Sequence, residues 1–254
     1  MAAPPALPWR VVWITGASTG IGAEIARQLA ARGITVAVSA RSADRLSALA
    51  KDNARLKPYP LDVTDARAVA ATYAAIGRDL GAVDLVLAAA GTYAPLTLDA
   101  FSPAPFRSMY ETNYLGVIHV LSAVLPDLRA RRSGHVAWIA SVAGYRGLPK
   151  AAAYGPTKAA LINLAETLYL DLRDAGIGVS LINPGFVETP LTQQNAFTMP
   201  ALITPEQAAI EILRGWARGR FDIHFPKRFT RWLKLLRLLP YRLYFAAVSR
   251  FTGL

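Results

Sequence analysis

The sequence predicts a doubly wound α/β fold, in which one parallel sheet of seven strands carries helices on both faces. Short apolar runs alternate with longer helical patterns from residue 11 to residue 225, and a glycine-rich turn follows the first run. No repetitive or linker-like segment divides the 254 residues. Because parallel neighbours need crossover helices and both sheet faces must be covered, we expect a single domain of the Rossmann type.

The amino-terminal half is expected to supply four strands. VVWIT and TVAVS are apolar and rich in β-branched residues, a weaker run follows, and VDLVLAA is the most apolar of the four. Each run leads into a stretch with helical periodicity. The expected strands are 11–15, 35–39, 56–61 and 83–89, and the expected helices are 20–31, 43–50, 65–77 and 103–131.

The carboxyl-terminal half repeats the pattern. HVAWIAS and GVSLINP are buried-type strands, each leading towards a helix, and FDIHF is the last strand. The expected strands are 135–141, 178–184 and 221–225, and the expected helices are 152–174 and 205–218.

Residues 1–226 are expected to form this domain, and residues 227–254 a basic, amphipathic helical extension. A helical wheel places apolar side chains on one broad face and basic ones around the other. Such a helix could lie on an anionic bilayer, or pack its apolar face on the domain or on a second subunit. The apolar face comprises Phe229, Trp232, Leu233, Leu235, Leu236 and Leu239, and the basic residues are Lys227, Arg228, Arg231, Lys234 and Arg237.

Composition argues against several classes of site. The chain has no cysteine, so a disulfide framework and a thiolate metal site are excluded. His119, His135 and His224 lack the paired spacing of a catalytic zinc site, so no metal is expected. The net charge is +11, but residues 223–254 carry seven basic side chains and no acidic one. The remainder has an ordinary balance, so nucleic acid is not an expected partner.

The amino terminus lacks the basic segment and apolar core of a secretory signal. The most apolar carboxyl-terminal stretch is interrupted by Lys234, Arg237, Pro240 and Arg242, so it is not expected to span a bilayer. The expected location is the cytoplasm, with peripheral membrane contact as one alternative for the extension.

The glycine-rich turn TGASTGIG lies between the first strand and the first helix. In such folds this turn and the helix amino terminus face a pyrophosphate. Gly16 would form the tight turn, Gly20 would admit the phosphates, and Gly22 would allow close helix packing. No Gly-Lys-Ser/Thr follows, which disfavours nucleoside triphosphate hydrolysis. A purely structural glycine turn is the alternative.

Arg41 follows the second strand, where folds that bind NAD often place a carboxylate for the ribose 2′-hydroxyl. A guanidinium would instead pair with a 2′-phosphate, so NADP(H) is preferred over NAD(H). A solvated loop arginine is the alternative. Asp62, after the third strand, is placed to accept a hydrogen bond from the adenine amino group.

Tyr154 and Lys158 are four residues apart in AAAYGPTKAA, a segment built from small helix formers. One helical turn separates them, so the phenol and the ammonium are expected to project side by side. A Tyr-x-x-x-Lys pair also arises by chance as an exposed helical contact, and its meaning depends on the rest of the chain.

These residues occur in an order and at intervals that resemble the short-chain dehydrogenase/reductase family. The resemblance covers residues 10 to about 225. The motifs are TGASTGIG at 15–22, Asp62, AAAG at 88–91, Asn113, Ser141, Tyr154-x-x-x-Lys158 and NPGFVET at 183–189.

The resemblance implies a carbonyl reductase or alcohol dehydrogenase reaction. Tyr154 would be the general acid/base, Ser141 would hold the substrate oxygen, and Lys158 would bind the nicotinamide ribose. Asn113 would anchor a water that links Lys158 to solvent. The cofactor contacts implied are Gly16, Ser18, Thr19, Gly20, Ile21, Arg41, Asp62, Val63, Ala89, Gly91, Tyr154, Lys158, Pro184, Gly185, Val187 and Thr189.

Two positions depart from the family pattern. Ala88 stands where the family usually has an asparagine whose side chain braces the central strands. Pro156 lies in the active-site helix, and since proline fits best in a first turn, Tyr154 is expected near the start of that helix or beside a slight distortion of it.

Tyrosine ordinarily titrates near pH 10, which suits a proton carrier poorly at neutral pH. The Lys158 ammonium, together with a positive nicotinamide ring, is expected to lower the pKa of Tyr154.

Substrate contacts are expected from two loops at the strand ends, 142–149 and 186–204. Their side chains predict a hydrophobic ketone or secondary alcohol as substrate, in a homodimer or homotetramer as the family resemblance implies. A non-catalytic protein that senses dinucleotides, and an NAD-preferring dehydrogenase, are the alternatives. The predicted pocket residues are Val142, Tyr145, Leu148, Leu191, Phe197 and Met199.

Overall fold

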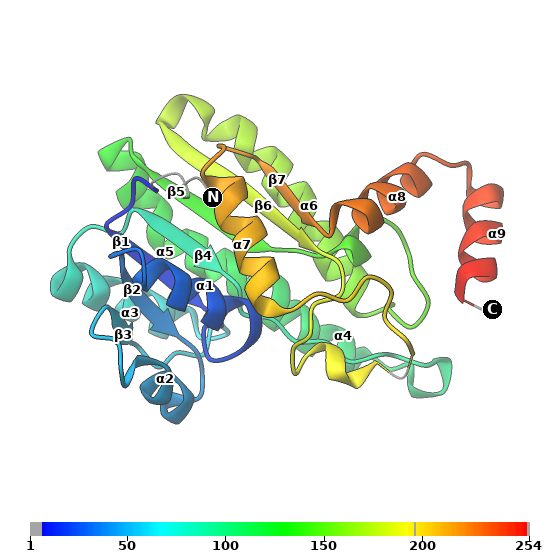
Figure 1. Cartoon of the computed structure of the whole chain (residues 1–254), viewed down its shortest axis with the longest axis horizontal. Helices are drawn as coiled ribbons and strands as arrows, with labels where there is room; N and C mark the ends of the chain where they lie inside the picture. Colours follow the sequence, from blue (N-terminus) through cyan, green and yellow to red (C-terminus); the bar gives the residue numbers. More distant parts are fainter. Residues whose placement is uncertain (1–6, 196, 253–254) are drawn as a thin grey trace.

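Seven parallel strands form the sheet in the order β3-β2-β1-β4-β5-β6-β7. The computed structural model describes residues 7–195 and 197–252. Figure 1 shows α1 and α7 in front of the sheet and α5 and α6 behind it. The predicted doubly wound fold is therefore confirmed. The strands are β1 Val11–Thr15, β2 Thr35–Ser39, β3 Leu56–Pro58, β4 Leu85–Ala88, β5 Gly134–Ile139, β6 Ile177–Pro184 and β7 Asp222–Phe225.

Helices connect the strands and cover both faces. Buried residues of α1, α2 and α7 form one apolar cluster, and those of α3, α5 and α6 form another on the opposite face. Alternate residues of β1 enter the two clusters, since Val12 belongs to the first and Trp13 to the second. The helices are α1 Gly20–Ala30, α2 Ala43–Ala50, α3 Ala66–Leu80, α4 Pro103–Tyr110, α5 Gly116–Arg131, α6 Tyr154–Asp171, α7 Pro205–Trp216, α8 Lys227–Arg237 and α9 Tyr241–Thr252.

The strand order reverses between β1 and β4, which are neighbours in the sheet although two strands separate them in sequence. At such a reversal the connections leave β1 and β4 on opposite faces and open a crevice at the carboxyl ends of the strands. The glycine-rich turn follows β1 directly, so the fold places it at this crevice.

Most expected elements differ by a few residues at their ends, and three differences have a clear local cause. The third strand was expected to run to residue 61 but ends at Pro58; it is an edge strand, and Pro58 and Pro60 lack the N–H that a ladder needs. The helix expected over 103–131 is interrupted by a π-helical turn, Glu111–Leu115, which separates α4 from α5. Pro240 lies between α8 and α9, so the carboxyl-terminal extension forms two helices rather than one.

No helix among residues 7–195 and 197–252 combines the length and the apolarity that crossing a bilayer requires.

His135, at the start of β5, should make the protein sensitive to acid. Its Nε2 lies 2.8 Å from the Ser180 hydroxyl, and burial lowers the pKa of His135 from 6.5 to about 4. Between pH 6.5 and 4 the unfolded chain binds a proton that the folded chain does not, so stability falls as pH falls through this window. The loss from this side chain is up to about 3 kcal/mol.

Replacing His135 by asparagine should therefore flatten the acid limb of the stability profile. Urea unfolding of both proteins at pH 7 and at pH 4.5 measures the difference, and comparing the two pH values cancels any constant packing cost. His224, whose pKa is also lowered to about 4, retains its own contribution in both proteins. Equal losses in wild type and His135→Asn would contradict the assignment.

Candidate active site

The turn after β1 presents the amino terminus of α1 without a side-chain cap. Thr19 is the N-cap residue, and its side chain makes no capping hydrogen bond. Gly16 has φ of +69°, and a Cβ there would lie 2.5 Å from the amide nitrogen of Ala90. The first N–H groups of α1 are thus available to an anion, next to the end of β4. The half-buried residues around this helix end are Ser18, Thr19, Gly20 and Ile21.

The segment after β6 closes the other side of this helix end. A Cβ on Gly20 would lie 2.9 Å from Cγ2 of Thr189, so these two residues are in direct contact. Val187 is buried and pairs with Ile203, and the Gly185 amide donates to the Phe225 carbonyl over 2.8 Å. Pro184 is the buried last residue of β6. The structure therefore brings NPGFVET against the glycine turn.

Arg41 and Asp62 lie at the carboxyl ends of β2 and β3, and both are exposed. The Asp62 Oδ1 accepts hydrogen bonds from the Thr64 amide and hydroxyl at 3.0 and 2.9 Å. The pKa of Asp62 is lowered, chiefly by the Thr64 amide, and the nearby Arg41 charge also lowers it. Val63 beside it is buried, and a Cβ on Gly116 would meet its Cγ2 at 2.8 Å.

Ser141 and Lys158 are brought together by close packing of the β5 loop on α6. Ser141 follows β5, and its Oγ accepts a hydrogen bond from the Ala143 amide at 3.1 Å. A Cβ on Gly144 would lie 2.6 Å from the backbone carbon of Lys158. The Lys158 Nζ donates to the Ile139 carbonyl at 2.8 Å, at the end of β5.

Tyr154 is the first residue of α6, as the position of Pro156 predicted. The Lys158 Nζ lies 5.5 Å from the centre of the Tyr154 ring, and Lys158 is only 4% exposed. The Ser141 side chain also lies close enough to Tyr154 to influence the pKa of Tyr154. The three groups that the sequence separates by thirteen and four residues therefore form one cluster.

Asn113 lies in the π-helical turn and is fully buried. Its Oδ1 accepts from the Thr92 amide at 2.7 Å, and its Nδ2 donates to the Thr92 carbonyl at 2.9 Å and to the Thr157 hydroxyl at 3.2 Å. The side chain thus ties the loop after β4 to α6. Its expected part in holding a water stays a prediction.

The same loop after β4 brings Gly91 and Ala89 to the site. A Cβ on Gly91 would lie 3.4 Å from the Asn113 Oδ1 and 3.8 Å from the Lys158 Nζ, so Gly91 borders the cluster. The Ala89 amide donates to the Thr15 carbonyl at 3.2 Å.

Ala88 leaves a polar group unpaired in the centre of the sheet. Thr15 is its partner across the β1–β4 ladder, and the buried Thr15 hydroxyl has no hydrogen-bond partner within the described residues. The family pattern has an asparagine at position 88, whose amide could hydrogen-bond a neighbouring hydroxyl. Alanine cannot, and the hydroxyl of the adjacent Thr15 has no partner among the described residues.

The expected lowering of the Tyr154 pKa is not seen in the protein alone. Burial raises the pKa of Tyr154 to about 12, although the nearby Ser141 side chain acts in the opposite sense. Burial also lowers the pKa of Lys158 to about 7. Both shifts have one physical cause, because burial removes water from around these groups and so disfavours phenolate and ammonium alike.

Sequence reasoning missed an apolar wall beside Tyr154. Leu96 and Met109 are buried there, with Phe106 packed against them, and they come from the loop after β4 and from α4. The Tyr93 ring packs edge-on against Tyr154 with 5.0 Å between centroids. A weak signal was present, because apolar residues recur in 93–109 at irregular spacing, but only the fold places them against the catalytic cluster.

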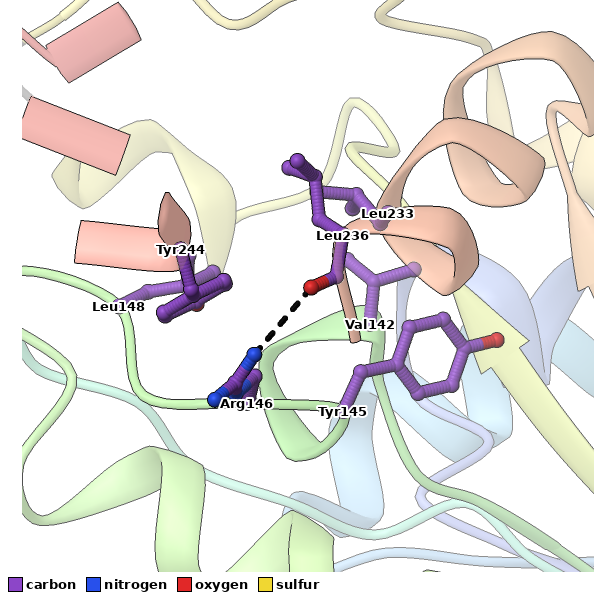
Figure 2. Close-up of a pocket in the computed structure, with 7 residues that line it drawn as sticks. All are labelled: Val142, Tyr145, Arg146, Leu148, Leu233, Leu236 and Tyr244. Atoms are coloured by element: carbon purple, nitrogen blue, oxygen red, sulfur yellow. Dashed lines mark hydrogen bonds between the residues drawn. The ribbon is translucent and has the colours of Figure 1, made fainter. Parts of the chain in front are cut away.

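The six predicted pocket residues do not form one pocket. Figure 2 shows Val142, Tyr145 and Leu148 lining a small pocket together with side chains of α8 and α9. Phe197 lies elsewhere, against Phe186. The predicted set did not include side chains of the extension, whereas helices α8 and α9 contact the loop after Ser141. The residues that α8 and α9 contribute are Leu233, Leu236 and Tyr244.

The arrangement fits a nicotinamide dinucleotide. The uncapped end of α1, the contact of Gly20 with Thr189 and the exposed Arg41 lie on one side of the crevice. The Ser141, Tyr154 and Lys158 cluster borders Gly91 on the other. The N–H groups at the end of α1 could therefore bind a phosphate group, and the hydroxyls of Ser141 and Tyr154 could hydrogen-bond a reacting carbonyl.

Comparison with known proteins supports this description. A family model of short chain dehydrogenases matches residues 10–199. A protein of Myxococcus xanthus, known as an uncharacterized oxidoreductase, is 36% identical over 249 residues, covering 96% of this chain and 98% of the relative.

Two solved structures are similar and hold a nicotinamide cofactor. The alcohol dehydrogenase of Thermococcus sibiricus, complexed with 5-hydroxy-NADP, has a TM-score of 0.75 and 29% identity over 85% of this chain and 95% of that one. A short-chain dehydrogenase/reductase of Burkholderia phymatum, in complex with NAD, has a TM-score of 0.81 and 25% identity over 89% and 92%. This chain belongs to the short-chain dehydrogenase family and is an oxidoreductase of that type.

Proposed function

We propose that the protein reduces the carbonyl group of an apolar small molecule with NADPH. The observation that carries this proposal is the cluster of Ser141, Tyr154 and the buried Lys158 at the carboxyl end of β5. A proton donor, a second hydroxyl and a cation meet there beside Gly91, which borders the crevice.

Each residue of the cluster has a separate role in the proposed reaction. When bound, the nicotinamide supplies the hydride. Tyr154 donates a proton to the carbonyl oxygen, and Ser141 hydrogen-bonds the same oxygen and holds it near the phenol. Lys158 orients the ribose hydroxyls through its ammonium. Asn113, in the adjacent π-helical turn, is the proposed anchor of the water that returns the proton from solvent.

The pKa values favour the reductive direction. A Tyr154 pKa of about 12 keeps the phenol protonated throughout the neutral range, which is the state that donates a proton. Alcohol oxidation needs the phenolate, which burial disfavours. Lys158, with a pKa of about 7, carries its charge most fully below neutral pH, so reduction should be faster at pH 6 than at pH 8.

The cofactor-binding residues predicted from the sequence are also part of this proposal. The glycine turn and the end of α1 would bind the pyrophosphate, with Thr189 beside them. Asp62 would accept from the adenine amino group through its second carboxylate oxygen, because the first is taken by Thr64. Pro184, Gly185 and Val187 would line the nicotinamide.

Arg41 is the residue that should select NADP(H). Its exposed guanidinium at the end of β2 can pair with a 2′-phosphate, whereas a carboxylate there would repel it. Arg41→Asp should therefore raise the Kd for NADPH about tenfold to a hundredfold and leave the Kd for NADH nearly unchanged. Fluorescence titration with both cofactors measures the two values.

Arg55→Asp is the matched control for Arg41→Asp. Arg55 is also exposed, but it precedes β3 at the opposite end of the sheet, so the same charge reversal should leave both Kd values unchanged. If Arg41→Asp leaves NADPH binding unchanged or improves it, the NAD-preferring alternative stands.

An apolar substrate is supported by the wall beside Tyr154. Leu96, Phe106 and Met109 present no charge to the phenol, and Tyr93 adds an aromatic face. A buried polar substrate would lose hydration there without gaining partners.

A substrate screen tests the proposed function. NADPH and NADH consumption would be followed with aryl ketones, steroids and long-chain keto lipids. We expect turnover of at least one apolar ketone with NADPH. The absence of turnover across the panel, together with tight NADPH binding, would support the alternative of a dinucleotide-sensing protein.

A further inference from the structure

Helix α8 is anchored to the domain through one of its faces. The predicted apolar face of the extension is split in the structure, because Leu236 is buried and Leu233 is partly buried against the core. A Cβ on Gly185 would lie 2.9 Å from the Phe229 ring, so this ring rests on the β6 loop. Lys234 forms an ion pair with Asp222 of β7. The face of α8 that packs on the domain is therefore not available to bind another molecule.

Arg146 holds the junction between α8 and α9. Its Nη1 donates to the Leu236 and Leu239 carbonyls at 3.3 and 2.7 Å, and the former bond is drawn in Figure 2. The guanidinium also lies over the rings of Tyr241 and Tyr244, 4.7 and 4.1 Å from their centres. The Tyr244 hydroxyl donates to the Gly147 carbonyl at 2.7 Å. These contacts orient both helices on the loop after Ser141.

Helices α8 and α9 also expose large apolar side chains. Seven of the fifteen large hydrophobic side chains that are exposed in the described residues lie on α8, on α9 or between them. Trp232 contacts Phe251 edge-on at 5.7 Å, which joins the surfaces of the two helices. In Figure 1, α9 is the outermost element of the molecule. The seven are Trp232, Leu235, Leu238, Tyr241, Leu243, Phe245 and Phe251.

Exposed arginines lie beside these apolar side chains on α8. Arg228 lies four residues before Trp232, and Arg231 lies four residues before Leu235, so each arginine shares a side of α8 with that apolar residue. Residues 223–254 contain no acidic side chain. We name this exposed surface of α8 and α9 the basic apolar surface. The exposed arginines of α8 and α9 are Arg228, Arg231, Arg237, Arg242 and Arg250.

We propose that the basic apolar surface binds an anionic lipid bilayer. Apolar side chains would enter the interface while arginines meet lipid phosphates, and Trp232 and Tyr241 are of the types that favour the headgroup region. A second copy of the chain fits less well, because a two-fold interface pairs a patch with itself and would set arginines against arginines. The proposal does not rest on the proposed function.

Vesicle flotation of the full-length protein tests this proposal. One set of vesicles contains phosphatidylcholine alone, and the other contains about 30 mol % phosphatidylglycerol. We expect at least about tenfold stronger partition onto the anionic set, and we expect high salt to weaken it. Arg228→Gln with Arg231→Gln should weaken partition at least about tenfold, since each basic side chain near the leaflet contributes severalfold.

The apolar contribution is tested by Leu235→Glu with Leu238→Glu. Both side chains are exposed, so the fold should tolerate the change, and thermal unfolding verifies this. Partition should fall at least about tenfold. Leu170→Glu on α6, where the leucine is 69% exposed but lies outside the basic apolar surface, should bind like wild type.

Three results would overturn the proposal. Wild type could show no preference for anionic vesicles, or the Leu235→Glu, Leu238→Glu variant could bind as tightly as wild type. Sedimentation could also show a wild-type dimer that this variant dissociates, without vesicle binding by either protein. That last result would assign the surface to a second copy of the chain.

Discussion

Replacing Tyr154 by phenylalanine is expected to lower kcat for carbonyl reduction by a factor of about 10² to 10⁴. The variant keeps the ring that packs against Tyr93 and removes only the hydroxyl that donates the proton. The affinity for NADPH should change by less than about threefold, since a general acid acts mainly in the transition state. Steady-state kinetics and cofactor titration measure the two effects separately.

Tyr169→Phe is the matched control for this experiment. Tyr169 is an exposed tyrosine near the other end of α6, packed on Phe221, and it should retain wild-type activity. Both variants should unfold at temperatures close to wild type. Wild-type kcat in Tyr154→Phe would show that another group donates the proton and would remove the proposed acid from the mechanism.

Replacing Gly144 by alanine is expected to destabilise the protein by about 1–3 kcal/mol and to reduce activity at least about a hundredfold. The added methyl would lie 2.6 Å from the Lys158 backbone carbon and 2.8 Å from the Ala159 amide nitrogen. Both are backbone atoms of α6, so neither can move without shifting the helix. Ser141 would then lose its position relative to Tyr154 and Lys158. Denaturant unfolding and kcat/KM measure the two losses.

Gly147→Ala provides the matched control in the same loop. A Cβ on Gly147 would meet no atom within 4 Å, so this variant should retain wild-type stability and activity. The Gly147 carbonyl, which accepts from Tyr244, is kept. If Gly144→Ala and Gly147→Ala behave alike, the close packing of the Ser141 loop on α6 is not what positions the cluster.

The order and type of the elements could be read from the sequence because local physics decides them. Buried parallel strands such as β4 are continuous apolar runs, and α1 begins directly after a glycine turn that only glycine accommodates. The position of Pro156 also placed Tyr154 at the start of α6, because proline is tolerated in a first turn.

Other features depended on contacts between residues far apart in the chain. The π-helical turn at Asn113 is sustained by hydrogen bonds to Thr92 and Thr157, which no local pattern indicates. The extension has one continuous apolar face in sequence, yet Leu236 is buried on the domain while Leu235 remains exposed. A helical wheel reports which side chains share a face, but it cannot report how much of that face a neighbouring element will cover.

The sequence by itself determined the fold class, the family and the identity of the residues that meet at the strand ends. Only the tertiary structure decided their electrostatics: Lys158 together with a bound nicotinamide was expected to lower the pKa of Tyr154, whereas in the protein alone burial raises it to about 12. The physical reason is that a motif specifies which charges are neighbours, whereas the loss of water around them depends on every element that packs over the site.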